Sequence, residues 1–230
     1  MQTEAKSPKE QVLALLRDRW WRLCNLYWIQ DENGVAVKFV PNEAQRQLWD
    51  DQHYLTVILK ARQLGFSTFI CIFILDTCLF RANTAAGVID ITLDDVKGKL
   101  GKIKFAYDRL PEDIRKAIPL KTDNTLELAW VNGSSVKGGT SHRGGTLQIL
   151  HVSEFGKISA QFPDKAREIR TGAFGTVHSG QMIFVESTAE GVGGDFYNIV
   201  TEAEQRAQAG KTPAKQEFKL LFFPWWKHKG

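Results

Sequence analysis

A short basic loop between two apolar runs contains the residue types that point most directly to chemistry. Its sequence is Lys60-Ala61-Arg62-Gln63-Leu64-Gly65-Phe66-Ser67-Thr68. A strand, a tight loop with a glycine and a helix that opens on Ser-Thr form the layout of a phosphate-binding loop. In that layout, backbone N–H groups at the start of the helix point at the phosphates, and the first-turn hydroxyl, here Ser67, reaches Mg²⁺. The loop therefore predicts a site for a nucleotide such as ATP with Mg²⁺.

The loop departs from the standard pattern G-x-x-x-x-G-K-[ST], because Lys60 stands at the first glycine and Phe66 at the lysine. A unit charge pair about 4 Å apart is worth about 4 kcal/mol at an effective dielectric constant near 20, so a phosphate site without a cation binds poorly. Lys60 and Arg62, upstream in the same loop, offer the missing charge from its other side. The alternative is an ordinary strand–turn–helix corner with two surface cations.

A second candidate element is an apolar strand that ends in an acidic residue. Residues 138–146 are rich in glycine and lead into the strand 147–152, which is followed by Ser153 and Glu154. Mg²⁺ takes oxygen ligands, and hydrolysis needs a carboxylate that orients and polarises the attacking water. Such a strand usually ends in Asp-Glu. Here Ser153 holds the Asp position, with direct or water-mediated contact to Mg²⁺, and Glu154 is the expected catalytic carboxylate.

Two further elements supply polar residues where a nucleotide site needs them. The strand 181–186 ends in Ser187-Thr188-Ala189-Glu190-Gly191, and ligands of open α/β sheets bind at the carboxyl ends of strands. Gln45 lies in the first turns of a helix that Pro41 and Asn42 open, upstream of the phosphate loop. Its amide offers a donor and an acceptor side by side, as adenine recognition requires. A solvent-facing glutamine is the alternative interpretation, and Gln47 is a second candidate.

The elements that must position these residues alternate between strands and helices. Apolar runs predict strands over residues 35–40, 54–59, 85–92, 147–153, 181–186 and 216–223, and a β-hairpin over 125–137. Helical spacing predicts helices over residues 8–29, from 41, from 67 to 80, and over 94–110, 111–119, 160–171 and 195–208, with a loop over 172–180. The alternation predicts an α/β fold with a mostly parallel central sheet flanked by helices.

Composition sets the broad class of the chain. It has 230 residues, 43% hydrophobic and 24% charged, which suits a globular domain with a substantial core. Cys24, Cys71 and Cys78 show no metal-binding spacing, and no apolar run predicts a membrane span or a signal peptide. The net charge of +4 is compatible with a nucleic-acid partner without requiring one. The lysines of the helix 94–110 form either a solvated face or an edge that contacts DNA or a partner.

Four elements in this order resemble the ATPase domain of tailed-bacteriophage large terminase subunits, the motors that package DNA. They are Gln45, the loop 60–68, Ser153-Glu154 and the segment 187–191. The phosphate loop of that family has its basic residue upstream, as in Arg62-Gln63-Leu64-Gly65-Phe66-Ser67. Its third motif is a strand followed by Ser-Thr-x-x-Gly, which matches residues 185–191. The resemblance covers nearly the whole chain and implies a P-loop NTPase fold of the RecA-like ASCE class.

The resemblance also implies roles for individual residues. Gln45 would bind adenine, Lys60 and Arg62 would contact phosphates, and Ser187 and Thr188 would sense the γ-phosphate. Gln63, Leu64, Gly65 and Phe66 would approach the phosphates with their backbone, while Ser67 and Thr68 would serve Mg²⁺ and phosphate. Glu154 would activate water, and Arg143 would act as an arginine finger in the site of a neighbouring subunit. Ser67, Ser153 and Glu154 form the expected metal site.

For the whole protein, the resemblance implies ATP hydrolysis that drives double-stranded DNA into a procapsid in the cytoplasm of a bacterial host. The implied partners are DNA, the portal protein, the small terminase subunit and further copies of this chain in a ring. Residues 1–40 are expected to form a helical, lid-like segment and residues 41–230 the ATPase domain. The nuclease domain that full-length members carry is not expected within this chain. A helicase-like DNA-dependent ATPase and a nucleotide- or DNA-binding module without hydrolysis are the alternatives.

Overall fold

A central sheet of eight strands organises the part of the chain that this computed structural model describes, residues 7–142 and 144–227. Parallel strands follow one another in the order β10 (Phe218–Phe223), β3 (Leu55–Lys60), β9 (Val177–Ser187), β8 (Leu147–Ser153), β4 (Ala85–Ile89) and β7 (Ser135–Gly139). The strands β6 (Glu127–Trp130) and β5 (Leu120–Asp123) extend the sheet with antiparallel pairing. The predicted mostly parallel sheet and the β6–β7 hairpin are confirmed.

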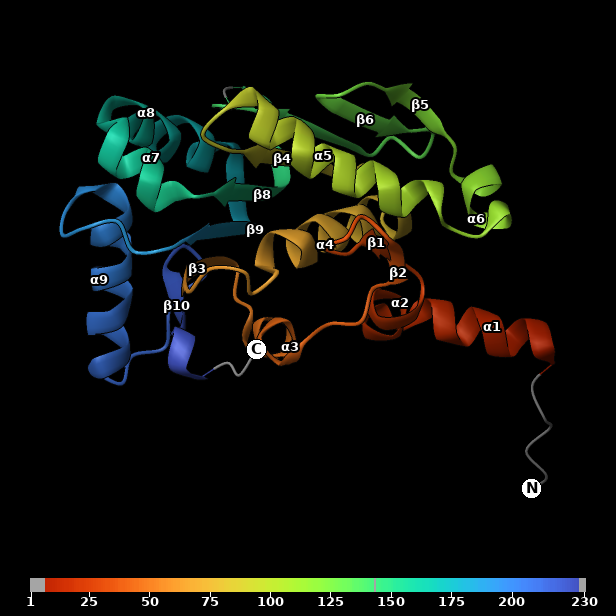
Figure 1. Cartoon of the computed structure of the whole chain (residues 1–230), viewed down its shortest axis with the longest axis horizontal. Helices are drawn as coiled ribbons and strands as arrows, with labels where there is room; N and C mark the ends of the chain where they lie inside the picture. The colour runs from red at the N-terminus through yellow and green to blue at the C-terminus, as the bar shows by residue number, and fades with distance from the viewer. Residues whose placement is uncertain (1–6, 143, 228–230) are drawn as a thin grey trace.

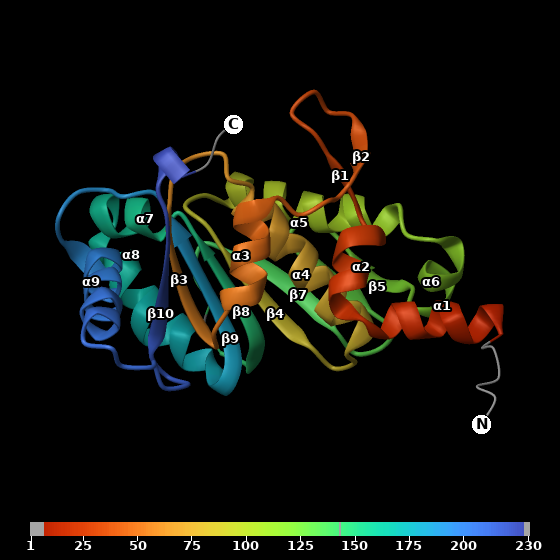
Figure 2. The same cartoon turned by 90° about the horizontal axis from the view of Figure 1, so that it is seen from below.

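Helices cover both faces of this sheet, as Figures 1 and 2 show. One face packs against α4 (Phe66–Phe80) and α5 (Leu93–Asp108), and the other against α7 (Phe155–Gln161), α8 (Pro163–Glu168) and α9 (Gly194–Gln208). Buried apolar side chains form one cluster beneath each group. Nearly every residue of α4 is buried, because its sequence is apolar on all sides.

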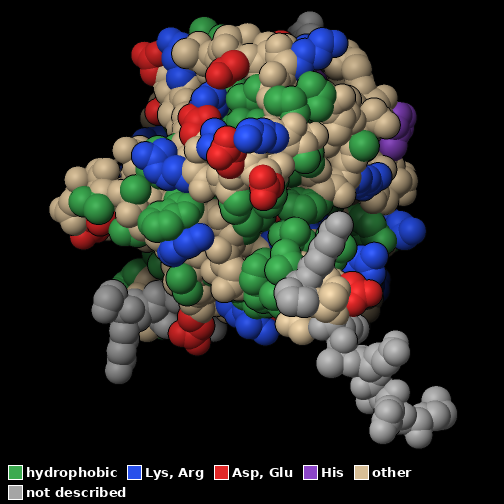
Figure 3. Space-filling model, turned by 90° about the vertical axis from the view of Figure 1, so that its right-hand side faces the viewer, with side chains coloured by type: hydrophobic (Ala, Val, Ile, Leu, Met, Phe, Trp, Pro, Cys, Tyr) green, Lys and Arg blue, Asp and Glu red, His purple; other side chains and the backbone are tan. Residues whose placement is uncertain are grey.

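Residues 8–40 differ from the prediction of a helix over residues 8–29. The structure has α1 (Pro8–Arg17), α2 (Arg19–Asn25) and a hairpin of β1 (Trp28–Gln30) and β2 (Ala36–Lys38) that projects from the body in Figure 2. The single helix is wrong because Asp18 adopts an extended conformation, and its carboxylate accepts a hydrogen bond from Trp21 N at 3.1 Å, which caps α2. Hydrophobic side chains are visible on the end of the molecule that carries α1 (Figure 3).

A buried ion cluster fastens α2 to α4. The carboxylate of Asp76 is fully buried and accepts two hydrogen bonds of 2.8 Å from Arg22, one of 2.8 Å from the Tyr27 hydroxyl and one of 3.2 Å from Arg19. Burial, followed by the negative charge of Asp76, raises the pKa of Tyr27 well above its usual value, so the phenol stays a donor. Since a buried carboxylate is tolerated when it is paired and hydrogen-bonded, this cluster holds α2 in one position.

The connection from β8 to β9 also differs from the predicted helix over 160–171 and loop over 172–180. The helix α7 ends before Phe162, and Pro163 starts α8 because a proline is tolerated in a first helical turn. A π-helical turn, Ile169–Ala173, and a 3₁₀ turn, Phe174–Thr176, follow, and β9 begins at Val177, earlier than predicted. The remaining helices are α3 (Glu43–Asp51), α6 (Glu112–Ala117) and a 3₁₀ turn, Trp225–Lys227. None of the described helices has the length and apolar character of a membrane span.

Candidate functional site

The phosphate loop lies between β3 and the N-terminus of α4, as its sequence predicts. Gly65 is the N-cap of α4 with φ 73°, a left-handed conformation that favours glycine. Because glycine has no side chain, no side-chain cap occupies the first N–H groups of this fifteen-residue helix. A Cβ at position 65 would lie 2.5 Å from Gln45 Nε2, so a larger residue here would also have to displace the amide of Gln45. The helix therefore presents its positive N-terminus to an anion.

Phe66 explains why the standard lysine is missing from this loop. Its side chain is buried at the start of α4, and its ring centroid lies 4.6 Å from that of Phe223 on β10. Burying such an aromatic side chain contributes about 1.5–3 kcal/mol to folding. Position 66 therefore serves the core, and a cation for the phosphates has to come from elsewhere in the loop.

Lys60 is the cation of this loop whose side chain points toward the carboxyl ends of the strands. Its side chain is 9% exposed, and its Nζ lies 3.5 Å from Glu154 Oε1 and 3.6 Å from Glu186 Oε2. Lys60 ends β3, Glu186 belongs to the end of β9 and Glu154 follows β8. These three strands are neighbours in the sheet, so the ion group spans their carboxyl ends. This edge is where open α/β sheets bind ligands.

Glu154 combines this position with an unusual backbone. It caps the N-terminus of α7 with φ 52° and ψ 37°. The described non-glycine residues with positive φ are Gln63, Asn83 and Glu154, so two of them belong to this site. Such conformations cost about 1–3 kcal/mol and cluster at functional sites. The side chain of Glu154 remains 29% exposed, so water can reach the carboxylate that is expected to activate it.

Glu186 is a fully buried carboxylate in contact with the phosphate loop. Its Oε1 accepts a hydrogen bond from the Ser67 hydroxyl and lies 2.9 Å from His151 Nε2. Burial alone would raise the pKa of Glu186, but the hydrogen bond and charge of His151, the charge of Lys60 and the hydrogen bond from Ser67 lower it to about 2. Glu186 is therefore a carboxylate anion at neutral pH.

Unpartnered polar atoms gather at the same edge. Among the described residues, the buried side-chain polar atoms without a hydrogen-bond partner are Trp130 Nε1, His151 Nδ1, Ser153 Oγ, Glu186 Oε2 and Ser187 Oγ. All except that of Trp130 belong to β8 and β9, toward their carboxyl ends. Buried polar groups are normally hydrogen-bonded, and exceptions mark functional positions or bound ions. These oxygens and the open helix terminus fit a nucleotide with Mg²⁺, which is held by few carboxylates and by substrate phosphates.

The described residues contain no group of three or more His, Cys, Asp or Glu side chains that could enclose a metal by themselves. In the predicted metal site, Ser67 lies in α4 after β3, Ser153 ends β8 and Glu154 follows β8, with β9 between the two strands. Ser153 Oγ makes no hydrogen bond to either of the other two side chains. A metal at this site would therefore take part of its ligands from the nucleotide.

Gln45 is placed at the phosphate loop but makes a different contact from the one expected. Its Nε2 donates to Gly65 O at 2.8 Å, and its Oε1 accepts from Asn42 N at 3.0 Å within the capping box of α3. The side chain is buried, and both ends of the amide are engaged by protein atoms. The adenine contact stays a prediction, and the structure shows Gln45 fastening α3 to the loop.

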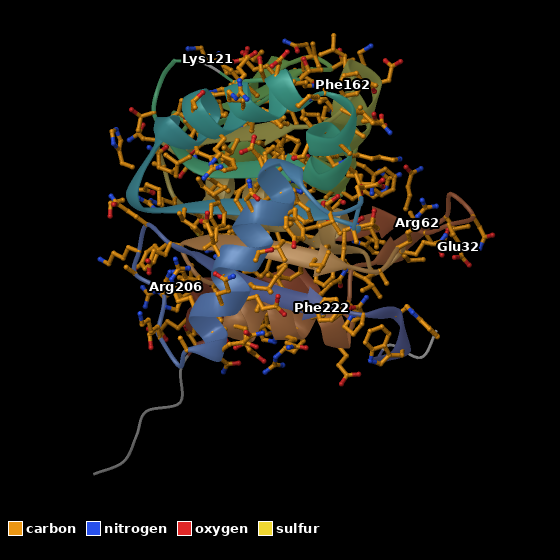
Figure 4. The ribbon with its side chains drawn as sticks, turned by 90° about the vertical axis from the view of Figure 1, so that its left-hand side faces the viewer. Glu32, Arg62, Lys121, Phe162, Arg206 and Phe222 are labelled. Carbon is orange, nitrogen blue, oxygen red and sulfur yellow. The ribbon has the colours of Figure 1, made fainter. Side chains whose placement is uncertain are left out.

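The other predicted residues are distributed around this centre. Thr68 accepts a hydrogen bond of 3.0 Å from Lys102, and Thr188 is half-buried in the turn after β9. Arg62 is exposed and, within the described part of the chain, forms no hydrogen bond or ion pair; Figure 4 shows it at the edge of the molecule on the side of Glu32. Arg143 lies outside the described residues. Gln63 is exposed in the turn of the loop, and Leu64 packs against the core cluster beside α4.

Sequence reasoning did not assign four polar residues to this centre, although it noted the lysines of the helix 94–110. They are His151, Glu186, Lys99 and Lys102. His151 and Glu186 interrupt apolar strands, and a charge inside a buried strand requires a partner, so this pattern could have revealed them. Lys99 pairs with Asp90 at the end of β4, and that carboxylate outweighs the effect of burial and raises the pKa of Lys99. The lysines of α5 therefore form two groups. Lys99 and Lys102 contact residues near the site, whereas Lys97 and Lys104 pair with acidic residues on the surface.

Comparison with known proteins identifies the fold. No protein-family model matches the sequence, and no curated protein matches it. Among solved structures, the chain is similar to the large terminase ATPase domain of Thermus phage P74-26, at 17% identity and a TM-score of 0.60, over 82% of this chain and 83% of that one.

Two longer proteins are similar as well. The HK97 bacteriophage large terminase aligns at 12% identity and a TM-score of 0.61, over 94% of this chain and 44% of its own. The large terminase of a thermophilic bacteriophage aligns at 10% identity and a TM-score of 0.51, over 78% of this chain and 45% of its own. The chain thus spans less than half the length of these two proteins. It has the P-loop NTPase fold of phage large terminase ATPase domains, which confirms the predicted resemblance at the level of the fold.

Proposed function

We propose that this chain is the ATP-hydrolysing motor domain of a phage large terminase. The observation that carries the proposal is the position of Lys60. It ends the strand that leads into the phosphate loop, and its ammonium group reaches the carboxylates of Glu186 at the end of β9 and Glu154 just after β8. A cation, an open helix N-terminus and a partly exposed carboxylate then meet at one edge of the sheet, as phosphoryl transfer to water requires.

In the proposed reaction, the N-terminus of α4 binds the phosphates through backbone N–H groups of Phe66, Ser67 and Thr68. Lys60, with Arg62, offsets their charge. Glu154 orients the attacking water and accepts its proton, while the bond between the γ-phosphorus and the β–γ bridging oxygen breaks to give ADP and phosphate. Ser187 and Thr188 respond to the presence of the γ-phosphate.

The ion pair between Lys60 and Glu154 suggests that ATP binds before Glu154 can act on water. Phosphates compete with Glu154 for the ammonium group of Lys60. When they draw Lys60 away, the carboxylate of Glu154 becomes available to water. Mg²⁺, bound near Ser67 and the carboxylates, would neutralise charge on the β- and γ-phosphate oxygens.

For the assembled motor, we propose that the chain acts on double-stranded DNA in the cytoplasm of a bacterial host, at the portal of a procapsid. The partners would be the portal protein, the small terminase subunit and neighbouring copies in a ring. The basic net charge and the similarity to large terminase ATPase domains support this assignment.

Phosphate release tests the proposed activity. With ATP and Mg²⁺, the chain is expected to release phosphate, and double-stranded DNA with portal and full-length terminase is expected to increase the rate. A coupled phosphate assay measures both. ATP binding without phosphate release under any of these conditions would favour a nucleotide-binding module. Absence of ATP binding would contradict the proposal as a whole.

A mixing experiment tests Arg143 as a finger that acts on the neighbouring subunit. Arg143→Ala protein is expected to lose phosphate release by roughly 10³- to 10⁵-fold, the usual effect of an arginine finger. Mixed with Glu154→Gln protein, it should regain part of the activity, because each variant supplies what the other lacks. Arg17→Ala, in α1, is the matched control. If no mixing ratio or concentration restores hydrolysis, Arg143 does not act on a neighbour.

A further inference from the structure

We propose that Glu186 is the carboxylate that, together with Ser67, binds the Mg²⁺ of the nucleotide, in place of the acid that is missing at position 153. This inference rests on the proposed function, because the metal enters with the nucleotide. It assigns a role to a residue that the sequence motifs leave outside the site.

The register of the sheet places Glu186 where that acid is needed. Ser153 on β8 and Glu186 on β9 are paired residues of adjacent parallel strands, so they lie at the same level of the carboxyl edge. Position 153 is where the strand of a P-loop enzyme ordinarily carries its metal-binding aspartate. With serine in place of that aspartate, β8 lacks the carboxylate. The neighbouring strand β9 provides a carboxylate, that of Glu186, beside position 153.

The contact with Ser67 is the second argument. P-loop enzymes hold Mg²⁺ between the Ser/Thr hydroxyl of the loop and a carboxylate. Here the Ser67 hydroxyl donates a hydrogen bond directly to Glu186 Oε1, although the two residues are 119 positions apart in the sequence. The hydroxyl of Ser153 has no hydrogen-bond partner among the described residues. The pair of ligand types that Mg²⁺ requires is therefore formed by Ser67 and Glu186.

The surroundings of Glu186 suit a metal ligand better than a purely structural ion pair. His151 Nε2 lies 2.9 Å from Oε1 and would orient the carboxylate, as hydrogen-bonded outer residues orient metal-binding carboxylates. The other oxygen, Oε2, is buried without a hydrogen bond from the described residues, and its distance to Lys60 Nζ is 3.6 Å. A structural pairing with His151 accounts for Oε1 but leaves Oε2 without a hydrogen bond, with only the ammonium group of Lys60 near it.

Charge supports the same conclusion. Glu154 and Glu186 place two carboxylates around the ammonium group of Lys60. A bound triphosphate would bring further negative charge to this edge. A divalent cation beside Glu186 would balance it, while Glu154, whose side chain is more exposed, keeps its separate role toward water.

The test compares the Mg²⁺ dependence of ADP binding in wild type and in Glu186→Gln. Isothermal titration gives the Kd for ADP with Mg²⁺ and with EDTA, and electron paramagnetic resonance gives the Kd for Mn²⁺ in the presence of ADP. The variant should bind Mn²⁺ weaker by at least the roughly 10- to 100-fold that loss of an outer-shell partner costs, and it should bind ADP without metal as well as wild type or better. Adding Ser153→Asp to this variant should restore metal binding, because it returns a carboxylate to the same edge.

Controls separate the metal role from stability and from the proposed function. Asp76→Asn alters another buried carboxylate, which pairs with α2 rather than with the site, and should lower the melting temperature without changing the Kd for Mn²⁺. If Glu186→Gln does not fold, Glu186→Asp is used, and it should weaken Mn²⁺ binding because its carboxylate is retracted. Unchanged Mn²⁺ affinity in the folded variant overturns the inference. Wild-type protein that binds no ADP with or without Mg²⁺ contradicts the proposed function instead.

Discussion

Glu154→Gln is expected to reduce ATP turnover by about 10²- to 10⁴-fold, the usual contribution of a general base. The amide keeps the size of the side chain but cannot accept a proton from water. Affinity for ATP should remain or rise, because the variant removes a negative charge that competes with phosphates for Lys60. Single-turnover phosphate release and equilibrium binding of a non-hydrolysable ATP analogue measure the two effects separately.

The matched control for this variant is Glu202→Gln, an acid-to-amide change at an exposed position of α9. Its turnover should equal that of wild type. If Glu154→Gln retains the wild-type rate, Glu154 has no part in the chemical step, and the strained backbone at this residue needs another explanation.

Lys60→Met is expected to weaken ATP binding by on the order of 10³-fold. The estimate takes about 4 kcal/mol for a charge pair near 4 Å at an effective dielectric constant of about 20, and about 1.4 kcal/mol for each factor of ten. Methionine keeps much of the length of the side chain and removes its charge. Isothermal titration with ATPγS measures the loss of affinity. Thermal unfolding shows whether the variant is still folded, since Glu154 and Glu186 no longer have Lys60 as a partner.

Arg62→Met provides the comparison within the same loop. Arg62 is exposed, whereas the side chain of Lys60 is 9% exposed and directed at the strand ends. Solvent screens an exposed charge more strongly, so Arg62→Met should have a smaller effect on ATP binding. An effect of Arg62→Met larger than that of Lys60→Met would move the phosphate-binding role from Lys60 to Arg62.

Local patterns predicted most elements that build the site. The strand, loop and helix around Gly65, the β6–β7 hairpin and the strand before Glu154 all follow from apolar periodicity and turn residues within short windows. The helix break at Asp18 and the early start of β9 at Val177 were missed. The break depends on the side-chain cap of Asp18, and the start of β9 follows a π-helical turn. Each of these features involves only a few residues, so hydrophobic periodicity over a longer window does not reveal it.

The composition of the site was harder to predict, because it depends on which strands become neighbours. The ion group joins Lys60, Glu154 and Glu186 from β3, β8 and β9, and the order of these strands is a property of the whole sheet. Glu186 was therefore missed, although a charge within the apolar strand 181–186 indicated a partner. Gln45 lies beside the loop, and its amide binds the loop backbone, a contact that spacing alone could not reveal.

A structure of the chain with ATPγS and Mg²⁺ would test most directly whether the upstream cation replaces the lysine that position 66 lacks. The account predicts the triphosphate at the N-terminus of α4, with Lys60 Nζ within hydrogen-bond distance of a phosphate oxygen and Phe66 still packed on Phe223. Nucleotide bound at another place, or a triphosphate at α4 while Lys60 remains paired with Glu154 and Glu186, would contradict it.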